Sequence, residues 1–154
     1  MKKMLILSDS HGRAEKTEDI ILGEKDIDII VHLGDGSRDI SQTSPAVGGK
    51  ALYQCRGNCD YYDPDAAADI LIRCENILVM GVHGDKYGVK QGLTRLSFAA
   101  RSKKAGLCLF GHTHLPFCEE DSGIIFLNPG SAACGKYAVV TVDGDKISAQ
   151  LKEC

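Results

Sequence analysis

The chain has 154 residues, a mass of 16.6 kDa and a formal net charge of −3 at pH 7. Its hydrophobic fraction of 44% and charged fraction of 25% are ordinary for a folded domain, which argues against a disordered chain. The acidic balance excludes a strong nucleic-acid footprint, and no apolar run approaches the ~20 residues of a membrane span. This length predicts a single domain over residues 1–154.

The N-terminus and the cysteines indicate the compartment. Two lysines open the chain, but the apolar stretch after them ends at Leu7, which is too short for a secretory signal. Seven cysteines at irregular spacing, with no C-x-x-C pair, do not form the pattern of a disulfide framework or a thiolate zinc site. We therefore expect a cytoplasmic protein that does not contact a membrane.

The first third of the chain predicts a βαβ unit followed by a third strand. Residues 3–8 and 28–33 are continuous apolar runs typical of buried strands, and residues 13–22 between them are expected to be a helix that ends at a glycine. This order predicts two parallel strands joined by a crossover helix. Residues 51–55 are a third strand, and residues 37–50, rich in Ser, Thr, Pro and Gly, are expected to be partly loop.

The rest of the chain predicts one helix, one buried strand and mainly antiparallel pairs. Residues 89–104 have apolar side chains at helical spacing, and Gly106 is the expected C-cap. Residues 107–110 are a buried strand. Residues 70–81 hold a hairpin or two consecutive strands, and two further hairpins are expected over residues 117–127 and 137–151. The chain therefore opens as α/β and closes in antiparallel strands, an α/β (α+β) class.

Polar side chains follow five of the expected strands, each beside a glycine or a serine. They are Asp9, His11, Asp35, Asn58, His83, His112 and His114. Because ligands of an α/β sheet bind outside the carboxyl ends of its strands, we expect these side chains to converge on one point. Asp9 and His11 are two residues apart, as are the last two histidines, so in an extended chain each pair projects to one side.

This donor set predicts a metal centre. Two carboxylates, one amide and four imidazoles suit Mn²⁺, Fe²⁺, Zn²⁺, Co²⁺ or Ni²⁺ better than Mg²⁺. Seven ligands exceed one tetrahedral zinc ion and are enough for two ions ~3.5–4 Å apart, if one carboxylate bridges them. At any single position a turn-forming residue or a satisfied histidine is the commoner explanation. The whole set at strand ends favours a binuclear centre.

The remaining polar residues have other interpretations. His32 lies inside the second expected strand, and we interpret it as structural or as a support of the site. Asp60, Asp63 and Asp65 are interpreted as solvated loop acids. Asp85 lies two residues after His83, and the sequence does not decide whether it is a loop residue or part of the site.

Several short motifs occur in a fixed order. They are Asp-Ser-His-Gly at 9–12, Gly-Asp at 34–35, Arg-Gly-Asn-Cys-Asp at 56–60, His-Gly at 83–84, Gly-His-Thr-His at 111–114 and Asn-Pro-Gly-Ser at 128–131. Together they resemble the calcineurin-like metallophosphoesterase superfamily, and their spacing resembles its small bacterial and archaeal branch, the YfcE-like phosphodiesterases. The resemblance implies a sandwich of two mixed β-sheets flanked by helices.

The resemblance also implies roles for the seven residues and two divalent ions as cofactors, with manganese ahead of nickel, iron, zinc or cobalt. One ion would be held by Asp9, His11, Asp35 and His114. The other would be held by Asp35, Asn58, His83 and His112, with Asp35 bridging. Asp35, Asn58 and His83 are counted as catalytic as well, and the nucleophile would be a hydroxide between the ions that attacks a phosphodiester.

Two departures from the family pattern concern the leaving group and the charge of the site. Many relatives carry a histidine directly after the asparagine, thought to protonate the leaving group, where this chain has Cys59. Relatives often have a further histidine where this chain has Asp85. A protonated thiol with a pKa of ~8.5 is a general acid only if it is well placed.

Two functions from different classes fit this family. The first is a phosphodiesterase that acts on a small phosphodiester, as a monomer or as a homodimer or homotetramer. The second is a non-catalytic protein-binding scaffold like the eukaryotic trafficking subunit Vps29, which has the same fold. A scaffold tolerates the loss of ligands, whereas this sequence keeps all seven, and this completeness favours the enzyme.

Overall fold

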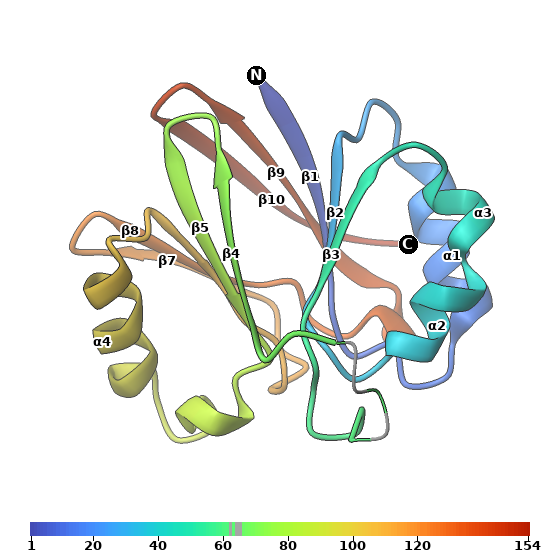
Figure 1. Cartoon of the computed structure of the whole chain (residues 1–154), viewed down its shortest axis with the longest axis horizontal. Helices are drawn as coiled ribbons and strands as arrows, with labels where there is room; N and C mark the ends of the chain where they lie inside the picture. The colour runs from blue at the N-terminus through green and yellow to red at the C-terminus, as the bar shows by residue number, and fades with distance from the viewer. Residues whose placement is uncertain (62, 64–65) are drawn as a thin grey trace.

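The computed structural model describes residues 1–61, 63 and 66–154, and its strands form two five-stranded sheets (Figure 1). The strands of the first sheet are β1 (Lys2–Leu7), β2 (Ile29–His32), β3 (Ala51–Gln54), β9 (Lys136–Asp143) and β10 (Lys146–Glu153). The strands of the second sheet are β4 (Asp69–Cys74), β5 (Ile77–Val82), β6 (Leu107–Leu109), β7 (Phe117–Asp121) and β8 (Ile124–Asn128).

Both sheets are mixed, which confirms the expected fold class. The first has the order β10-β9-β1-β2-β3. In it, β1, β2 and β3 run parallel to one another, and β9 is antiparallel to both of its neighbours, β1 and β10. The second has the order β4-β5-β6-β8-β7, in which β5, β6 and β8 run parallel. The two strands at its edges, β4 and β7, are antiparallel to their neighbours.

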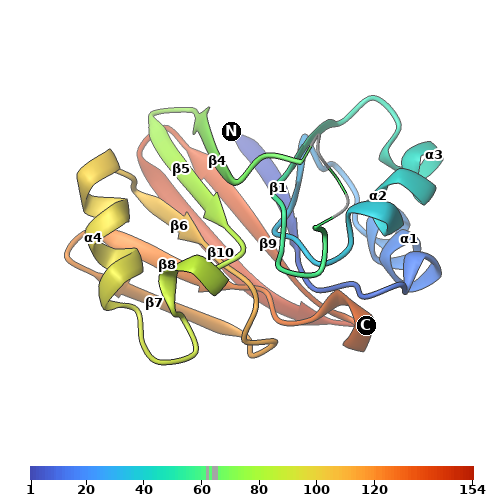
Figure 2. The ribbon, with the colours of Figure 1, turned by 60° about the horizontal axis from the view of Figure 1, so that its bottom comes forward.

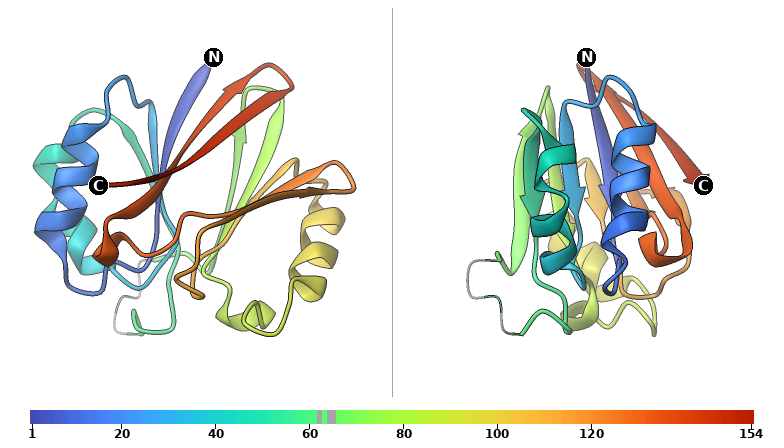
Figure 3. Two further views of the ribbon diagram at one scale, coloured as in Figure 1. Left: turned by 180° about the vertical axis from the view of Figure 1, so that it is seen from behind. Right: turned by 90° about the vertical axis from the view of Figure 1, so that its right-hand side faces the viewer.

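Helices cover the outer faces of the two sheets, as the front and back views show (Figure 3). The helices beside the first sheet are α1 (Ala14–Gly23), α2 (Ser37–Gln42) and α3 (Ser44–Val47). The second sheet carries α4 (Thr94–Lys103), and two 3₁₀ turns complete the chain, η1 (Asp85–Tyr87) and η2 (Ala132–Cys134). Among the described residues, no helix is long and apolar enough to cross a membrane.

The core explains why the central strands are continuous apolar runs. On β1, Met4 and Ile6 belong to the hydrophobic cluster between the sheets, which also contains Leu107 of β6. Leu5 lies between them in the sequence and belongs to a second hydrophobic cluster on the opposite face of the sheet, which also contains Ile20 of α1. Because alternate side chains point to opposite faces, a strand that is buried on both faces needs apolar residues at every position.

One expected loop segment also contains helices, and one predicted helix differs from the structure. Residues 37–50 are partly loop, as expected, and also contain α2 and α3, since backbone N–H groups at the start of α2 are held by a buried carboxylate described below. The helix predicted over residues 89–104 begins only at Thr94. It ends before Lys104, which adopts a left-handed φ of 58° and serves as the C-cap in place of Gly106.

The carboxyl ends of five strands meet at one edge of the molecule, which Figure 2 turns toward the viewer. Three of these strands, β1, β2 and β3, belong to the first sheet. The other two, β5 and β6, belong to the second. The donors predicted to converge at strand ends therefore lie where the ends of the two sheets come together.

Candidate metal centre

The loops after these five strands bring the predicted donors into two neighbouring groups. We call Asp9, His11 and His114 the outer triad, and Asp35, His83 and His112 the inner triad. In each triad, one potential ligand atom of every residue lies within 4.8 Å of the others. The seventh predicted donor, Asn58, lies beside the inner triad.

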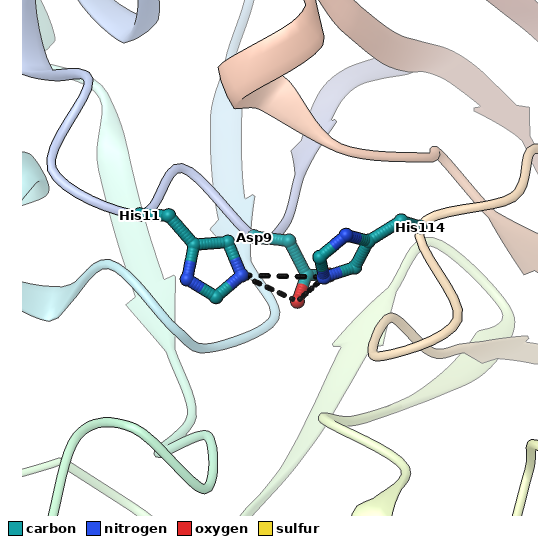
Figure 4. Close-up of side chains that lie close together, drawn as sticks. All are labelled: Asp9, His11 and His114. Carbon is teal, nitrogen blue, oxygen red and sulfur yellow. Dashed lines mark hydrogen bonds and ion pairs between the residues drawn. The ribbon is translucent and has the colours of Figure 1, made fainter.

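The outer triad converges on one buried carboxylate oxygen (Figure 4). The Nε2 atoms of His114 and His11 lie 3.1 and 3.6 Å from Oδ1 of Asp9, and 3.2 Å from each other. Oδ2 of Asp9 accepts hydrogen bonds from the Ser8 hydroxyl at 2.5 Å and from the backbone N–H of His112 at 3.0 Å. Oδ1 is buried without a hydrogen-bond partner.

An unpaired buried carboxylate oxygen is costly unless something compensates its charge. Two imidazole nitrogens face this oxygen of Asp9, and each offers a lone pair when the ring is neutral. A divalent cation would satisfy all three atoms at once, and mixed nitrogen and oxygen donors are those that transition metals accept. The outer triad therefore fits a metal ion.

In the inner triad, the protein itself fixes the tautomer of one histidine. Nδ1 of His83 lies 2.7 Å from the carbonyl oxygen of Leu33, and because a carbonyl only accepts, this nitrogen carries a proton. Nε2 of His83 then faces Asn58 Oδ1 at 2.9 Å, His112 Nδ1 at 3.2 Å and Asp35 Oδ2 at 3.3 Å. A backbone carbonyl that holds the far ring nitrogen is the usual support of a metal-binding histidine.

Asp35 lies between the two triads. Its Oδ2 faces His83 of the inner triad at 3.3 Å and His11 of the outer triad at 3.8 Å. Its Oδ1 accepts a hydrogen bond of 2.7 Å from the backbone N–H of Cys59, which fixes the carboxylate plane. This is the position that a bridging ligand requires.

The electrostatics of the inner triad keep its carboxylate ionised. Burial alone would raise the pKa of Asp35, but hydrogen bonds from His83 and from the Cys59 backbone lower that pKa to about 2. Burial likewise opposes a charge on His83, yet Asp35 and Asp9 raise the pKa of this imidazole. Burial and the nearby charges of His83 and Lys90 lower the pKa of His112.

Five of the seven donors have a backbone conformation that is rare for residues with a side chain. Their φ values are 54° for Asp9, 43° for His11, 58° for Asp35, 69° for His112 and 62° for His114. Left-handed φ is uncommon outside glycine, and each such residue costs on the order of 1 kcal/mol. The expectation of extended pairs is therefore wrong: His112 joins the inner triad and His114 the outer one.

Asp60 was interpreted as a solvated loop acid, and the structure corrects this. Its side chain is buried and accepts backbone N–H groups at both oxygens, Asp35 at 2.6 Å and Gly57 at 2.9 Å on Oδ2. Oδ1 accepts from Gly36 at 3.0 Å and Ser37 at 3.2 Å. Asp60 thus ties together the loops after β2 and β3. Asp65 lies outside the described residues.

Three further residues support the donor loops. His32 is fully buried in β2, where its Nδ1 accepts the Gly34 N–H at 3.2 Å and its Nε2 lies 3.1 Å from the Ser10 hydroxyl. Burial lowers its pKa to about 4, which agrees with a neutral structural histidine. In the Asn-Pro-Gly-Ser motif, the Asn128 amide donates to the Gly111 carbonyl, and the Ser131 hydroxyl donates to the Asp9 carbonyl.

Cys59 and Asp85 border the triads. The sulfur of Cys59 lies within 4.8 Å of ligand atoms of His11 and Asp35, so it is a donor position that the sequence did not assign. Partial burial and the charge of Asp35 raise the pKa of this thiol, which keeps it protonated at neutral pH. Asp85 begins η1, and its charge acts to raise the pKa of His112.

Comparisons with known proteins agree with these features. A curated relative from Methanothermobacter thermautotrophicus, named a probable metallophosphoesterase, is 28% identical over 95% of this chain and 89% of its own. A Streptococcus pneumoniae structure described as a predicted phosphoesterase has a TM-score of 0.81 at 24% identity, covering 99% of this chain and 89% of that one. Vacuolar protein sorting 29 from Cryptosporidium parvum has a TM-score of 0.79 at 16% identity, covering 99% and 97%.

The family model for the calcineurin-like phosphoesterase superfamily domain matches residues 1–145. This match spans all seven donors and both sheets as far as β9. It confirms the resemblance inferred from the motifs, and it agrees with the names of the curated relatives. The chain belongs to the calcineurin-like phosphoesterase superfamily, a family of metal-dependent phosphoesterases.

Proposed function

We propose that this protein is a binuclear metal-dependent phosphodiesterase. The observation that carries the proposal is the pair of triads that Asp35 joins, together with the buried oxygen of Asp9 that has no hydrogen-bond partner. Two transition-metal ions would satisfy this oxygen and the facing lone pairs. We further propose that residues 1–154 form a single domain, because one hydrophobic cluster contains residues of both sheets, and that it acts in the cytoplasm.

Each proposed ligand has an assigned place. One ion would be held by Asp9, His11, Asp35 and His114. The other would be held by Asp35, Asn58, His83 and His112, with manganese first and nickel, iron, zinc or cobalt as alternatives. When bound, such ions supply Lewis acidity toward a phosphate and lower the pKa of the attacking water.

The chain's own residues orient and select the substrate. The Leu33 carbonyl holds His83 through Nδ1, and the backbone N–H of Cys59 holds Asp35, so these catalytic groups keep their geometry before substrate arrives. Asp85 adds a negative charge beside His112, which disfavours the dianion of a phosphomonoester relative to the monoanion of a diester. Diesters are therefore the preferred class.

The alternative is a non-catalytic scaffold. The likeness to vacuolar protein sorting 29 concerns the fold, which enzymes and scaffolds share. Vps29 from Entamoeba histolytica has a structure with bound zinc, so one metal ion does not separate the two functions. The left-handed backbone at five donor positions and the buried carboxylate oxygen without a partner are costs that a complete binuclear centre would offset. These two costs favour the enzyme.

Hydrolysis by the metal-loaded protein tests the proposal. Metal-free protein is loaded with Mn²⁺ and assayed with bis(p-nitrophenyl) phosphate and p-nitrophenyl phosphate. We expect hydrolysis of the diester above the monoester, loss of activity with chelator, and inactivity of Asp9→Asn. Asp145→Asn, an exposed acid in the last hairpin turn, is the matched control and should keep full activity. A metal-loaded protein that hydrolyses neither ester would support the scaffold instead.

A further inference from the structure

A groove of about 460 Å³ lies beside the donors, on the side of the loop that carries His112 and His114. Its volume falls within the range of small-molecule sites, roughly 300–1,000 Å³. Its walls come from the segment between β5 and α4, from the end of β6 and from the chain that leads into β7. Most of its lining is apolar: Val89, Leu93, Phe110, Leu115, Pro116 and Phe117.

The groove borders the loop that carries two of the donors. Thr113, which also lines it, stands in the chain between a donor of the inner triad and a donor of the outer triad. The hydroxyl oxygen of Thr113 accepts hydrogen bonds from the Asn128 amide at 2.9 Å and from the Leu115 N–H at 3.2 Å. This wall of the groove is therefore held in a fixed place relative to the donors.

One cation stands in this otherwise apolar lining. Lys90 is exposed and lines the groove, in which Thr113 of the donor loop also takes part. An ammonium group in this lining favours an anionic ligand over a neutral one. A phosphate monoanion bound at the donors would gain from this charge.

A second groove has the reverse character. It measures about 370 Å³, two of the donors, His11 and Asp35, line it, and the rest of its lining is polar, with Arg38, Asp39 and Cys59 among the side chains. The donor loops thus border one polar groove and one apolar groove. A phosphodiester has two ester arms, and two grooves of opposite character would take arms of different chemistry.

Leu115 shows that the apolar lining is not part of the core. Its side chain is 67% exposed, directly after the last donor of the chain. Phe110 and Phe117, by contrast, contact each other with ring centroids 6.0 Å apart and form the floor. Together with the apolar lining of the groove, the exposed Leu115 side chain offers surface that an apolar group of a ligand would remove from water.

We propose that this groove binds an apolar, aromatic-sized ester arm of the phosphodiester substrate, with Leu115 covering the arm and Lys90 next to the phosphate. The proposal rests on the proposed function. An ester arm is the proposed occupant because Thr113 and Leu115, on either side of the donor His114, form one wall of the groove, so that an arm of a phosphate held by this donor would lie next to it. The natural substrate is then a diester with one apolar and one polar arm.

Binding of two symmetric diesters tests the groove whichever arm occupies it. Diphenyl phosphate and dimethyl phosphate are titrated into the Mn²⁺-loaded protein by calorimetry. Burial of one phenyl ring predicts that diphenyl phosphate binds at least about tenfold more tightly. Leu115→Ser should remove most of this preference and leave dimethyl phosphate unchanged. Leu22→Ser, at a leucine 64% exposed on α1, is the matched control and should keep the preference.

Lys90→Gln should change the binding of the two diesters in a different way from Leu115→Ser. Removal of the ammonium should weaken both diesters by a similar factor, about threefold for a partly exposed charge, and keep their ratio. A loss confined to diphenyl phosphate would contradict the place assigned to Lys90. Methyl signals of ¹³C-labelled Leu93 and Leu115 should shift with diphenyl phosphate and not with dimethyl phosphate.

The outcomes separate this proposal from the proposed function. Equal binding of the two diesters by a wild-type protein that hydrolyses diesters would overturn the groove alone. A preference that survives Leu115→Ser unchanged would do the same. Leucine signals that shift with protein concentration, together with a dimer in sedimentation, would assign the groove to a second copy and overturn the ester arm. Failure to bind or hydrolyse any diester would overturn the proposed function.

Discussion

The two triads use the same kinds of side chain but differ in their access to solvent. In the outer triad the side chains of His11 and His114 are 34% and 47% exposed, whereas in the inner triad that of His83 is 1% exposed. The carboxylates of both triads are buried. His112 of the inner triad is partly exposed, so the inner position is the more enclosed of the two and the outer position the more open to solvent.

The triads also differ in what orients their rings. The Leu33 carbonyl holds His83 through the ring nitrogen that faces away from the donors. His11 and His114 contact, in the described part of the chain, each other and the carboxylates of the site. We infer that the inner position binds an ion more tightly, because its ligands lose less freedom when they bind.

Asp35 is the proposed bridging ligand, and removing its charge should weaken metal binding at both triads. The difference in metal affinity between them should then disappear. Asp35→Asn keeps the shape and the acceptor for the Cys59 N–H but loses the charge. Manganese content should fall from two ions per chain to below one, and diester hydrolysis by about 10³-fold, as when a charge-stabilising group is lost. Elemental analysis and initial rates measure this. Two retained ions would show that Asp35 is not the bridge.

Removal of His114, an exposed proposed ligand, should affect metal binding at the outer triad and not at the inner one. His114→Ala takes a donor from the outer triad and leaves the contacts of the inner triad intact. We expect about one ion to remain and activity to fall on the order of 10²-fold, the scale of a disturbed metal ligand. Equilibrium dialysis with Mn²⁺ measures the stoichiometry. A loss of both ions would mean that the sites fill only together.

Replacing Asp60 should destabilise the loops that carry the inner triad without removing any proposed metal ligand. In Asp60→Asn, the amide nitrogen faces two backbone N–H donors in either orientation, and these donors stay unpaired. We expect the free energy of unfolding to fall by about 2–4 kcal/mol, as for buried polar groups left without partners. Urea unfolding of metal-free protein measures this. Asp145→Asn should stay within about 0.5 kcal/mol of wild type.

The smallest effect is expected at Cys59, an exposed thiol beside His11 and Asp35. General-acid help is worth ~10²–10⁴-fold for poor leaving groups, and a protonated thiol gives little of it. Cys59→Ala should therefore change aryl diester rates less than about twofold, whereas Cys59→His should raise alkyl diester rates selectively. A leaving-group series on the three proteins measures this. A large loss on aryl diesters in Cys59→Ala would show that the thiol takes part in catalysis.

The sequence predicted four of the five strands of the site well because they are largely buried, whereas β3, at the edge of its sheet, is mostly exposed and was indicated by a weaker pattern. An apolar run as short as 107–110 is typical of a buried strand, and the first donor after it follows directly in the sequence. The Ser-rich and Gly-rich segment 37–50 was harder, because the start of α2 depends on N–H groups that a distant residue, Asp60, accepts. Local propensity contains no information about such a contact.

The same reason explains which site residues the sequence missed. The seven donors stand next to strand ends, so position along the chain indicated them. Asp60 looked like an ordinary turn acid, and only its burial against four N–H groups shows its role. The left-handed backbone at His112 and His114 could not be predicted from sequence, because histidine is enriched at positive φ but still adopts it in only a small minority of cases.

Calorimetric titration of the metal-free protein with Mn²⁺ tests the central claim, two joined but unequal ion positions, most directly. The account predicts two binding events per chain with different affinities, of which His114→Ala removes the weaker and Asp35→Asn disturbs both. A single event, or two equal and independent events that survive Asp35→Asn, would contradict it.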